Sequence, residues 1–222
     1  MSQETWSAVD QYFSDQLVKS DAVLEAALAA SAAAKLPAIH VSANQGKLLM
    51  LMARMCGARN ILEIGTLGGY STIWLARALP PGGKLITLEF EARHAEIARS
   101  NLARAGFSEI VDIRLGKAIE TLPKLQAENR GPFDFIFVDA DKPSNPDYFT
   151  WALKLSRPGS VIIIDNVVRS GAVVNAASTD ASVQGVRRLT EMIGNEPRVS
   201  ATAIQTVGSK GYDGFAMVLV NK

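Results

Sequence analysis

Between residues 60 and 165 the chain switches repeatedly between short apolar runs and longer stretches with charges at helical spacing. Each apolar run has the length of a buried strand. The runs are NILEIG, KLITLEF, VDIRL, FDFIFVD and SVIIID. Helices are expected between them, over residues 71–79, 92–105, 117–125 and 146–155. This alternation predicts an α/β fold in which helices cover both faces of a parallel sheet.

The two ends of the chain depart from this alternation. Residues 5–35, rich in alanine and leucine, predict one helix, and Ser42 or Asn44 could cap a second helix that ends near Gly57. After a helix over residues 182–193, the runs VSATAIQTV and FAMVLV flank the glycine-rich segment GSKGYDG, which predicts an antiparallel pair at the end of the sheet. We expect a single domain over residues 1–222, with a helical part at 1–57 and an α/β core at 58–222.

Composition narrows the classes of function. The 222 residues are 48% hydrophobic, and a formal net charge of +1 gives no electrostatic case for binding nucleic acid or a membrane surface. The single cysteine, Cys56, excludes an internal disulfide, and its apolar surroundings predict a buried, inert thiol. We see no signal peptide and no apolar stretch long enough to span a membrane, so we expect a cytoplasmic protein.

The ends of the first two predicted strands carry the signals of a cofactor site, because ligands of open α/β sheets bind at the carboxyl ends of the strands. The first strand runs into EIGTLGGYS, a glycine-rich turn that opens a helix, and the second ends in Glu89. A glycine in such a turn is often only structural, and a glutamate often only meets solvent. In this order and spacing, the two together predict a cofactor that contains a nucleoside.

The charges of this crevice indicate which cofactor. The turn does not read G-x-G-x-x-G, and Glu63 directly precedes it. The fourth and fifth strands end in DADK and DN, so carboxylates line the crevice and Lys142 is its evident cation. Such a site repels a pyrophosphate but attracts a metal ion and the ammonium and sulfonium groups of S-adenosylmethionine.

Three hard oxygen donors, Asp139, Asp165 and Asn166, end two strands that should be neighbours. With two substrate oxygens and a water they would complete the octahedron that magnesium prefers. The competing interpretation is that the aspartates only cap the helices that follow.

From about residue 41 to residue 174 the sequence resembles the cation-dependent O-methyltransferases of the caffeoyl-CoA and catechol type, particularly bacterial members. The matching segments are VSANQGKLL, LEIGTLGGYS, the run ending in Glu89, GKAIETL, FVDADK and IIIDN. The resemblance implies a doubly wound, Rossmann-like class I methyltransferase sheet of seven mostly parallel strands with a C-terminal antiparallel strand. It also implies a homodimer.

The resemblance implies roles for the matching residues. Those around S-adenosylmethionine would be Val41, Glu63, Gly65, Thr66, Ser71, Glu89, Ala118 and Asp141. The metal ligands would be Asp139, Asp165 and Asn166, holding Mg²⁺ or alternatively Mn²⁺ or Ca²⁺. Lys142 would be the catalytic base, beside Asp139. The implied reaction methylates one hydroxyl of a small catechol-like acceptor such as a phenylpropanoid or flavonoid.

Some positions near the expected acceptor pocket differ from the family pattern. Plant-type members carry an aromatic residue where Asn145 stands, although the later Tyr148 matches them, and a tryptophan in the region that reads Val167-Val168-Arg169 here. These differences argue against a caffeoyl-CoA acceptor. Of the two histidines, His94 should be solvated, whereas His40 is either structural or at the border of the acceptor pocket.

Two other functions fit parts of the same pattern. The fold and site could methylate a hydroxyl of a modified tRNA nucleoside, against which the near-neutral charge argues. A non-catalytic cofactor-binding or NAD-binding module would use the same kind of sheet, but the absent G-x-G-x-x-G and the acidic set argue against it.

Overall fold

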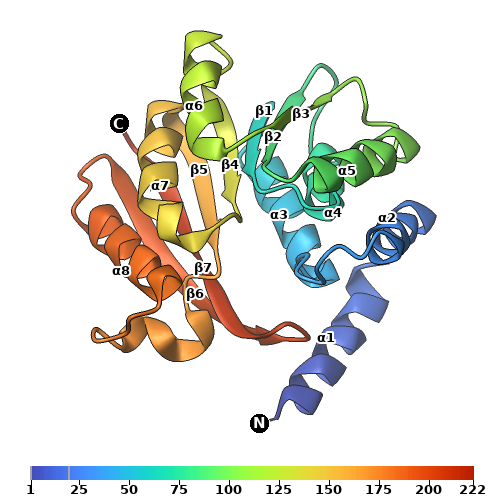
Figure 1. Cartoon of the computed structure of the whole chain (residues 1–222), viewed down its shortest axis with the longest axis horizontal. Coiled ribbons are helices and arrows are strands. Elements are labelled where there is room, and N and C mark those ends of the chain that lie inside the picture. The colour runs from blue at the N-terminus through green and yellow to red at the C-terminus, as the bar shows by residue number, and fades with distance from the viewer. Residues whose placement is uncertain (1, 20) are drawn as a thin grey trace.

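The computed structural model of the protein describes residues 2–19 and 21–222. Its centre is a seven-stranded sheet of order β3-β2-β1-β4-β5-β7-β6 (Figure 1). Only β7 runs antiparallel to its neighbours, β5 and β6, as the sequence predicts for an α/β methyltransferase sheet. The strands are β1 Asn60–Ile64, β2 Lys84–Glu89, β3 Val111–Leu115, β4 Phe133–Val138, β5 Ser156–Asp165, β6 Val199–Gly208 and β7 Gly211–Val220.

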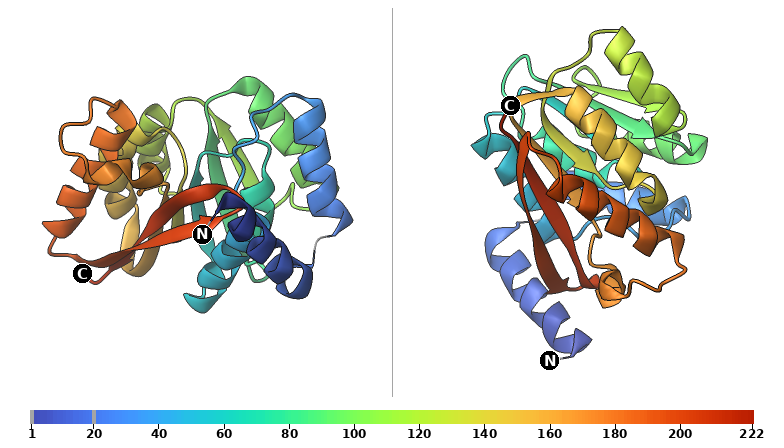
Figure 2. Two further views of the ribbon diagram at one scale, coloured as in Figure 1. Left: turned by 90° about the horizontal axis from the view of Figure 1, so that it is seen from below. Right: turned by 90° about the vertical axis from the view of Figure 1, so that its left-hand side faces the viewer.

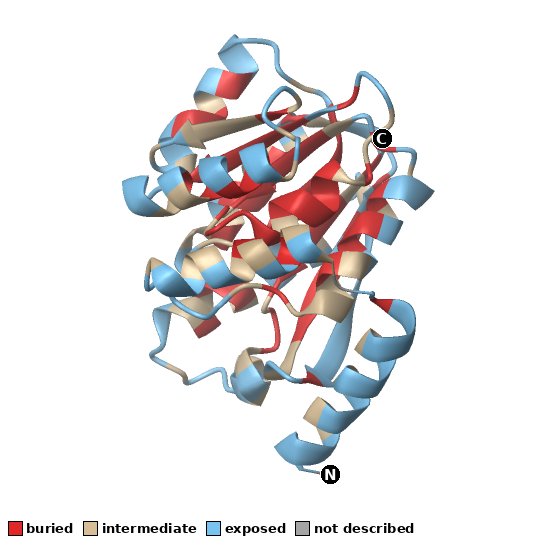
Figure 3. Cartoon of the chain, turned by 90° about the vertical axis from the view of Figure 1, so that its right-hand side faces the viewer, coloured by how far each residue is buried: buried red, intermediate tan, exposed pale blue. Residues whose placement is uncertain are grey.

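Helices cover both faces of the sheet and form a separate apolar core on each. One core lies beneath α2, α3, α4 and α5, and the other beneath α6, α7 and α8. Figure 3 shows the buried strands between the two layers, with α1 largely exposed at one end. The helices are α1 Gln3–Leu17, α2 Ala22–Ala33, α3 Ala43–Met55, α4 Tyr70–Ala76, α5 Ala92–Arg104, α6 Ala118–Ala127, α7 Asn145–Lys154 and α8 Ala181–Gly194, with the 3₁₀ turns η1 Lys142–Ser144 and η2 Arg169–Val174.

The prediction of one helix over residues 5–35 is wrong, because the chain breaks between α1 and α2. The Asp21 carboxylate accepts hydrogen bonds from the amides of Val23 and Leu24, both at 3.1 Å, and so caps a new helix. Asp21 also pairs at 2.8 Å with Arg77, the residue directly after α4, which fixes the start of α2 on the core. The break includes Ser20, which lies outside the described residues.

The C-terminal hairpin is tighter than predicted. Gly208 pairs with Gly211, so most of the expected GSKGYDG loop belongs to the strands. The hairpin tip rests against α1: Gln3 donates to the carbonyl of Gly208 at 2.8 Å, and the amide of Ser209 donates to Asp10 at 2.7 Å. Figure 2 shows α1 beside the β6–β7 hairpin in both views. None of the helices in the described ranges is long and apolar enough to cross a membrane.

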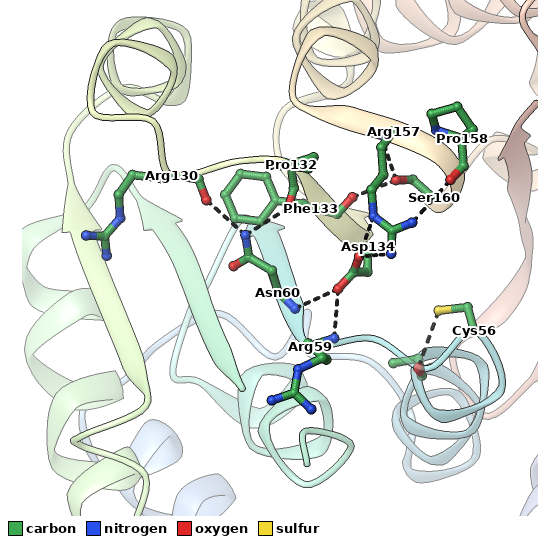
Figure 4. A network of polar contacts seen from close by, with 11 residues as sticks. Cys56, Arg59, Asn60, Arg130, Pro132, Phe133, Asp134, Arg157, Pro158 and Ser160 are labelled. Atoms are coloured by element: carbon green, nitrogen blue, oxygen red, sulfur yellow. Dashed lines mark hydrogen bonds and ion pairs between the residues drawn. The ribbon is translucent and has the colours of Figure 1, made fainter. Parts of the chain in front are cut away.

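A carboxylate at the amino ends of the strands ties three of them together (Figure 4). Asp134 of β4 accepts hydrogen bonds from the amides of Arg59 and Asn60, at 2.8 and 2.9 Å, and pairs with Arg157 of β5 at 2.6 Å. Burial by itself would raise the pKa of Asp134, but the two amides and Arg157 outweigh it and hold the pKa below its usual range. Nearby Cys56 is half-buried rather than buried, and burial raises the pKa of its thiol.

We expect Asp134→Ala to lower the free energy of unfolding by about 2–3 kcal/mol, because two partly buried amide hydrogen bonds and an arginine lose a charged acceptor. The pKa of Asp134 is lower in the folded than in the unfolded chain, so its stabilisation is present above about pH 4 and is lost as the pH falls through the folded pKa. Urea unfolding of both proteins at pH 7 and pH 3 should show the difference shrinking in acid. The control Asp112→Ala removes a more exposed carboxylate that pairs only with arginines, and should cost less than about 1 kcal/mol.

Candidate active site

A cavity of about 850 Å³ opens at the carboxyl ends of the parallel strands. Its volume suits a nucleoside-containing cofactor together with a small second ligand. The structure brings ten of the predicted site residues to its wall: Val41, Gly65, Thr66, Ser71, Glu89, Ala118, Asp139, Asp141, Lys142 and Asn166. The other two, Glu63 and Asp165, are buried beside the wall, with exposed fractions of 0% and 5%.

The turn after β1 needs glycine for two physical reasons. Gly65 and Gly69 have φ angles of +102° and +82°, which residues with a side chain rarely adopt. A Cβ at Gly65 would also collide with the main-chain carbonyl of Asp139 at the end of β4. The turn therefore lies directly against the neighbouring strand end and opens the cavity wall beside it.

Glu89 is held rigidly at the end of β2. Its carboxylate accepts hydrogen bonds from the amides of Thr66 and Leu67 in the glycine-rich turn, at 3.2 and 2.7 Å, and from the amide of Glu91 at 2.9 Å. An ionised carboxylate has about four acceptor positions, so it can still accept a hydrogen bond from a ligand hydroxyl. This arrangement fits the predicted contact with a ribose.

His94 is not solvated as the sequence analysis expected. It lines the cavity, and its Nδ1 lies 3.5 Å from the Glu89 carboxylate. His94 is the third residue of α5, which begins at Ala92, so the short connection after Glu89 keeps it close to the end of β2. The spacing of five residues after Glu89 is the only signal in the sequence that could have placed it there.

Glu63 lies beneath the glycine-rich turn rather than in the cavity wall. Its carboxylate accepts hydrogen bonds from the hydroxyls of Ser71, Thr72 and Thr87, at 2.6, 2.5 and 2.6 Å. Burial raises the pKa of Glu63 to about 7, against the opposing effect of these hydroxyls, and the charge of Asp139 adds to the rise. Glu63 thus orients Ser71, which reaches the cavity.

The predicted metal ligands gather on the side of the cavity formed by β4 and β5. Lys142 is buried, and its Nζ lies 2.8 Å from the Asp139 carboxylate. Burial raises the pKa of Asp165, and the negative charge of Asp139 raises it further, while Lys142 opposes the rise. Two carboxylates and an amide oxygen with this excess of negative charge are a donor set that fits a hard divalent cation. Among the residues that the structure describes, no group of three or more His, Cys, Asp or Glu side chains is arranged to hold a metal ion.

Sequence reasoning gave no role to Gln45 or Ser144, which help to hold the site, and it noted Tyr148 only as a family match beside the acceptor pocket. Gln45 of α3 donates from its side-chain amide to Asp165 at 2.6 Å, across 120 positions of the chain. The hydroxyls of Tyr148 and Ser144 both donate to Asp141 at 2.5 Å. Burial, and then the charge of Asp141, raise the pKa of Tyr148 above its usual range. Gln45 belongs to the matching segment VSANQGKLL, but nothing in helical spacing indicates which strand end it reaches.

His40 lines the cavity, which fits the second of its two expected roles, a place at the border of the acceptor pocket. Its ring meets that of Tyr70 edge to face, with the ring centroids 5.6 Å apart. Burial lowers the pKa of His40, and the positive charge of Lys210 lowers it further, so both effects favour the neutral imidazole.

Comparison with known proteins agrees with this geometry. The model of a family described as O-methyltransferase matches residues 14–219. A catechol O-methyltransferase of Niastella koreensis is 54% identical over 220 residues, covering 99% of this chain and all of the relative. The O-methyltransferase of Bacillus cereus, solved with SAH, superposes with a TM-score of 0.98 at 60% identity, covering 99% of this chain and 100% of that one.

A further solved structure carries the methyl donor itself. The O-methyltransferase TomG of Streptomyces achromogenes, involved in tomaymycin synthesis and solved with SAM, has a TM-score of 0.97 at 56% identity, with both chains fully covered. Sequence, fold and the cavity at the strand ends lead to one assignment. The chain belongs to the S-adenosylmethionine-dependent O-methyltransferase family.

Proposed function

We propose that the protein transfers a methyl group from S-adenosylmethionine to one hydroxyl of a vicinal dihydroxy aromatic, with a divalent cation bound by Asp139, Asp165 and Asn166. The observation that carries this proposal is the grouping of these oxygen donors with a buried lysine at one side of the cavity. The catechol O-methyltransferase of Niastella koreensis, similar over its whole length, supports the choice of acceptor.

In the sheet, β3, β2 and β1 lie to one side of the cavity and β4 and β5 lie to the other. We infer that the cofactor lies over β1, β2 and β3, since Glu89 and Ala118 follow the second and third of these strands. Its methionine end would lie near Val41, Gly65, Thr66 and Ser71, its ribose at Glu89 and its adenine near Ala118, with Asp141 at the edge. The acceptor then lies over β4 and β5.

Methyl transfer requires an ionised hydroxyl aligned with the methyl group of the sulfonium. A bound divalent cation, Mg²⁺ or alternatively Mn²⁺ or Ca²⁺, would lower the pKa of a chelating catechol. Lys142, once its ammonium has released a proton to solvent, would take the hydroxyl proton at its Nζ, and Asp139, 2.8 Å away, would orient that nitrogen. Gln45 and the amide of Asn166 hold both oxygens of Asp165 in place.

We also propose that the helical part, residues 1–57, serves both the acceptor site and a homodimer. Ile39, His40 and Val41 line the cavity. Val9, Tyr12, Phe13 and Leu17 are exposed at helical spacing and form an apolar stripe along α1. A second copy of the chain would cover this stripe.

Turnover with labelled S-adenosylmethionine tests the function. Catechol and simple flavonoids should accept the methyl group in magnesium and not in EDTA, whereas monophenols of similar size should react poorly because they cannot chelate. Labelling of unfractionated tRNA but of no catechol would contradict the proposal.

Glu89→Ala should weaken S-adenosylmethionine binding by roughly ten- to a hundredfold, since a hydrogen bond to a charged group contributes about 1.5–3 kcal/mol. Calorimetry with the cofactor measures this loss. Glu89→Gln, which keeps one acceptor oxygen, should show a smaller loss. Glu96→Ala removes an exposed carboxylate from α5 and should bind like the unaltered protein. Unchanged affinity in Glu89→Ala would remove Glu89 from the cofactor site.

A further inference from the structure

Arg169 is a cation of the cavity that the proposed chemistry does not use. It follows β5, three residues after Asn166, and lines the cavity near Lys142 and Ser182. Its Nε is buried and has no hydrogen-bond partner among residues 2–19 and 21–222. Native structures rarely leave a buried donor unpaired unless a water or a ligand completes it.

The two lysines of the cavity wall are paired. Lys142 pairs with Asp139 at 2.8 Å, and Lys117 lies 3.9 Å from Glu120. Arg169 forms no ion pair with any carboxylate that the structure describes. The amides of Val183 and Ser182 donate hydrogen bonds to Asp180 and hold the pKa of its carboxyl below the usual range, and the positive charge of Arg169 makes a smaller contribution. The Asp180 carboxylate is itself exposed at the surface. Arg169 therefore offers the cavity a positive charge that no acidic side chain neutralises.

The main chain fixes where this arginine stands. Arg169 and Ser170 have φ angles of 57° and 54°, in the left-handed region that residues with a side chain enter at a cost. Asp213 of β7 holds this conformation, since its Oδ1 accepts the amides of Val168 and Arg169 at 3.1 and 3.0 Å. A strained segment fixed in this way is typical of residues that must meet a ligand.

We propose that Arg169 binds a carboxylate of the methyl acceptor, so that the acceptor is an aromatic acid with two adjacent hydroxyls. This inference rests on the proposed function and names its acceptor class. A planar guanidinium pairs with a carboxylate through two parallel hydrogen bonds, which a neutral catechol cannot form. The carboxylate of the cofactor is the other candidate ligand. It is expected at the β1 turn near Gly65 and Ser71, whereas Arg169 follows β5.

The test compares two acceptors that differ mainly in charge, 3,4-dihydroxybenzoate and 4-methylcatechol. In Arg169→Gln, KM for the acid should rise by about 10- to 100-fold, the range for losing a charge-assisted hydrogen bond, while kcat and the KM for 4-methylcatechol stay nearly unchanged. Arg169→Lys should recover part of the loss. Arg188→Gln removes the same charge from an exposed site on α8 outside the cavity wall, and should leave both acceptors unaffected.

Acceptor kinetics, together with calorimetric binding of S-adenosylmethionine and of 3,4-dihydroxybenzoate, distinguish failure of this inference from failure of the proposed function. An equal loss for both acceptors would show that Arg169 only supports the fold of the pocket, and a loss of S-adenosylmethionine affinity would assign it to the cofactor; either result overturns the inference. If no catechol is methylated by the unaltered protein, the proposed function fails. Tighter binding of 3,4-dihydroxybenzoate to the unaltered protein than to Arg169→Gln would then still support the carboxylate site, and equal binding would overturn it.

Discussion

Asp165→Ala should abolish the turnover that depends on a divalent cation and leave S-adenosylmethionine binding largely intact. Lewis-acid stabilisation of the ionised hydroxyl is worth several kcal/mol, so the loss should be roughly a thousandfold or more. The cofactor should be spared because its expected contacts lie over β1, β2 and β3. EDTA should have the same effect on the unaltered protein, and magnesium or manganese should reverse it.

Thermal unfolding gives a second measure of the same site. A cation that binds only the folded protein raises its unfolding temperature, so magnesium should stabilise the unaltered protein but not Asp165→Ala. The variant should still fold, because it removes a buried carboxylate whose pKa is raised by burial and by Asp139. Asp147→Ala, an exposed aspartate on α7, is the control. Full activity of metal-free protein would reject the proposed mechanism, whereas the family assignment would stand.

Lys142→Ala should lower kcat by about 10²- to 10⁴-fold, the usual contribution of a positioned base, with little change in cofactor affinity. Raising the pH should recover part of the loss, because hydroxide can then ionise the chelated hydroxyl without help from the protein. The measurement is the pH profile of kcat for both proteins. Lys117→Ala removes another lysine of the cavity wall, at the cofactor side, and should leave this profile unchanged. If Lys142→Ala keeps the turnover of the unaltered protein at neutral pH, Lys142 is not the base and serves only as an ion-pair partner of Asp139.

The sheet could be predicted from sequence because its strands are buried on both faces. Runs such as FDFIFVD are apolar at nearly every position, and a glycine or carboxylate at the strand end reports the edge where ligands bind. Because Glu89, Asp139 and Asn166 all follow or end such strands, they were expected at this edge, and all three line one cavity. Helix boundaries were harder: the capping carboxylate of Asp21 divides an alanine-rich stretch that has high helix propensity throughout.

What sequence could not give is the depth of each side chain and its distant partners. Glu63 and Asp165 were expected at the site, but the sequence did not indicate that both are almost fully buried beside the cavity wall, with exposed fractions of 0% and 5%. The bond from Gln45 to Asp165 depends on how α3 crosses the sheet, which local periodicity does not specify. The cavity-facing position of His94 likewise depends on the angle at which α5 leaves β2.

The contact between α1 and the tip of the β6–β7 hairpin affects the order in which parts of the chain fold during synthesis. Gln3 bonds to Gly208 across 205 positions of the chain, and Asp10 accepts from Ser209 across 199. Before the hairpin is complete, α1 can dock only partly, through contacts with α3 such as the hydrogen bond from Asn44 to the Asp10 carbonyl at 3.3 Å, while most of the sheet assembles on the ribosome. Contacts of such long range form slowly, so α1 should be the last helix to acquire protection from hydrogen exchange during folding. Its apolar stripe is exposed in the folded chain as well, so chaperones or other chains can reach it both before and after the hairpin is complete.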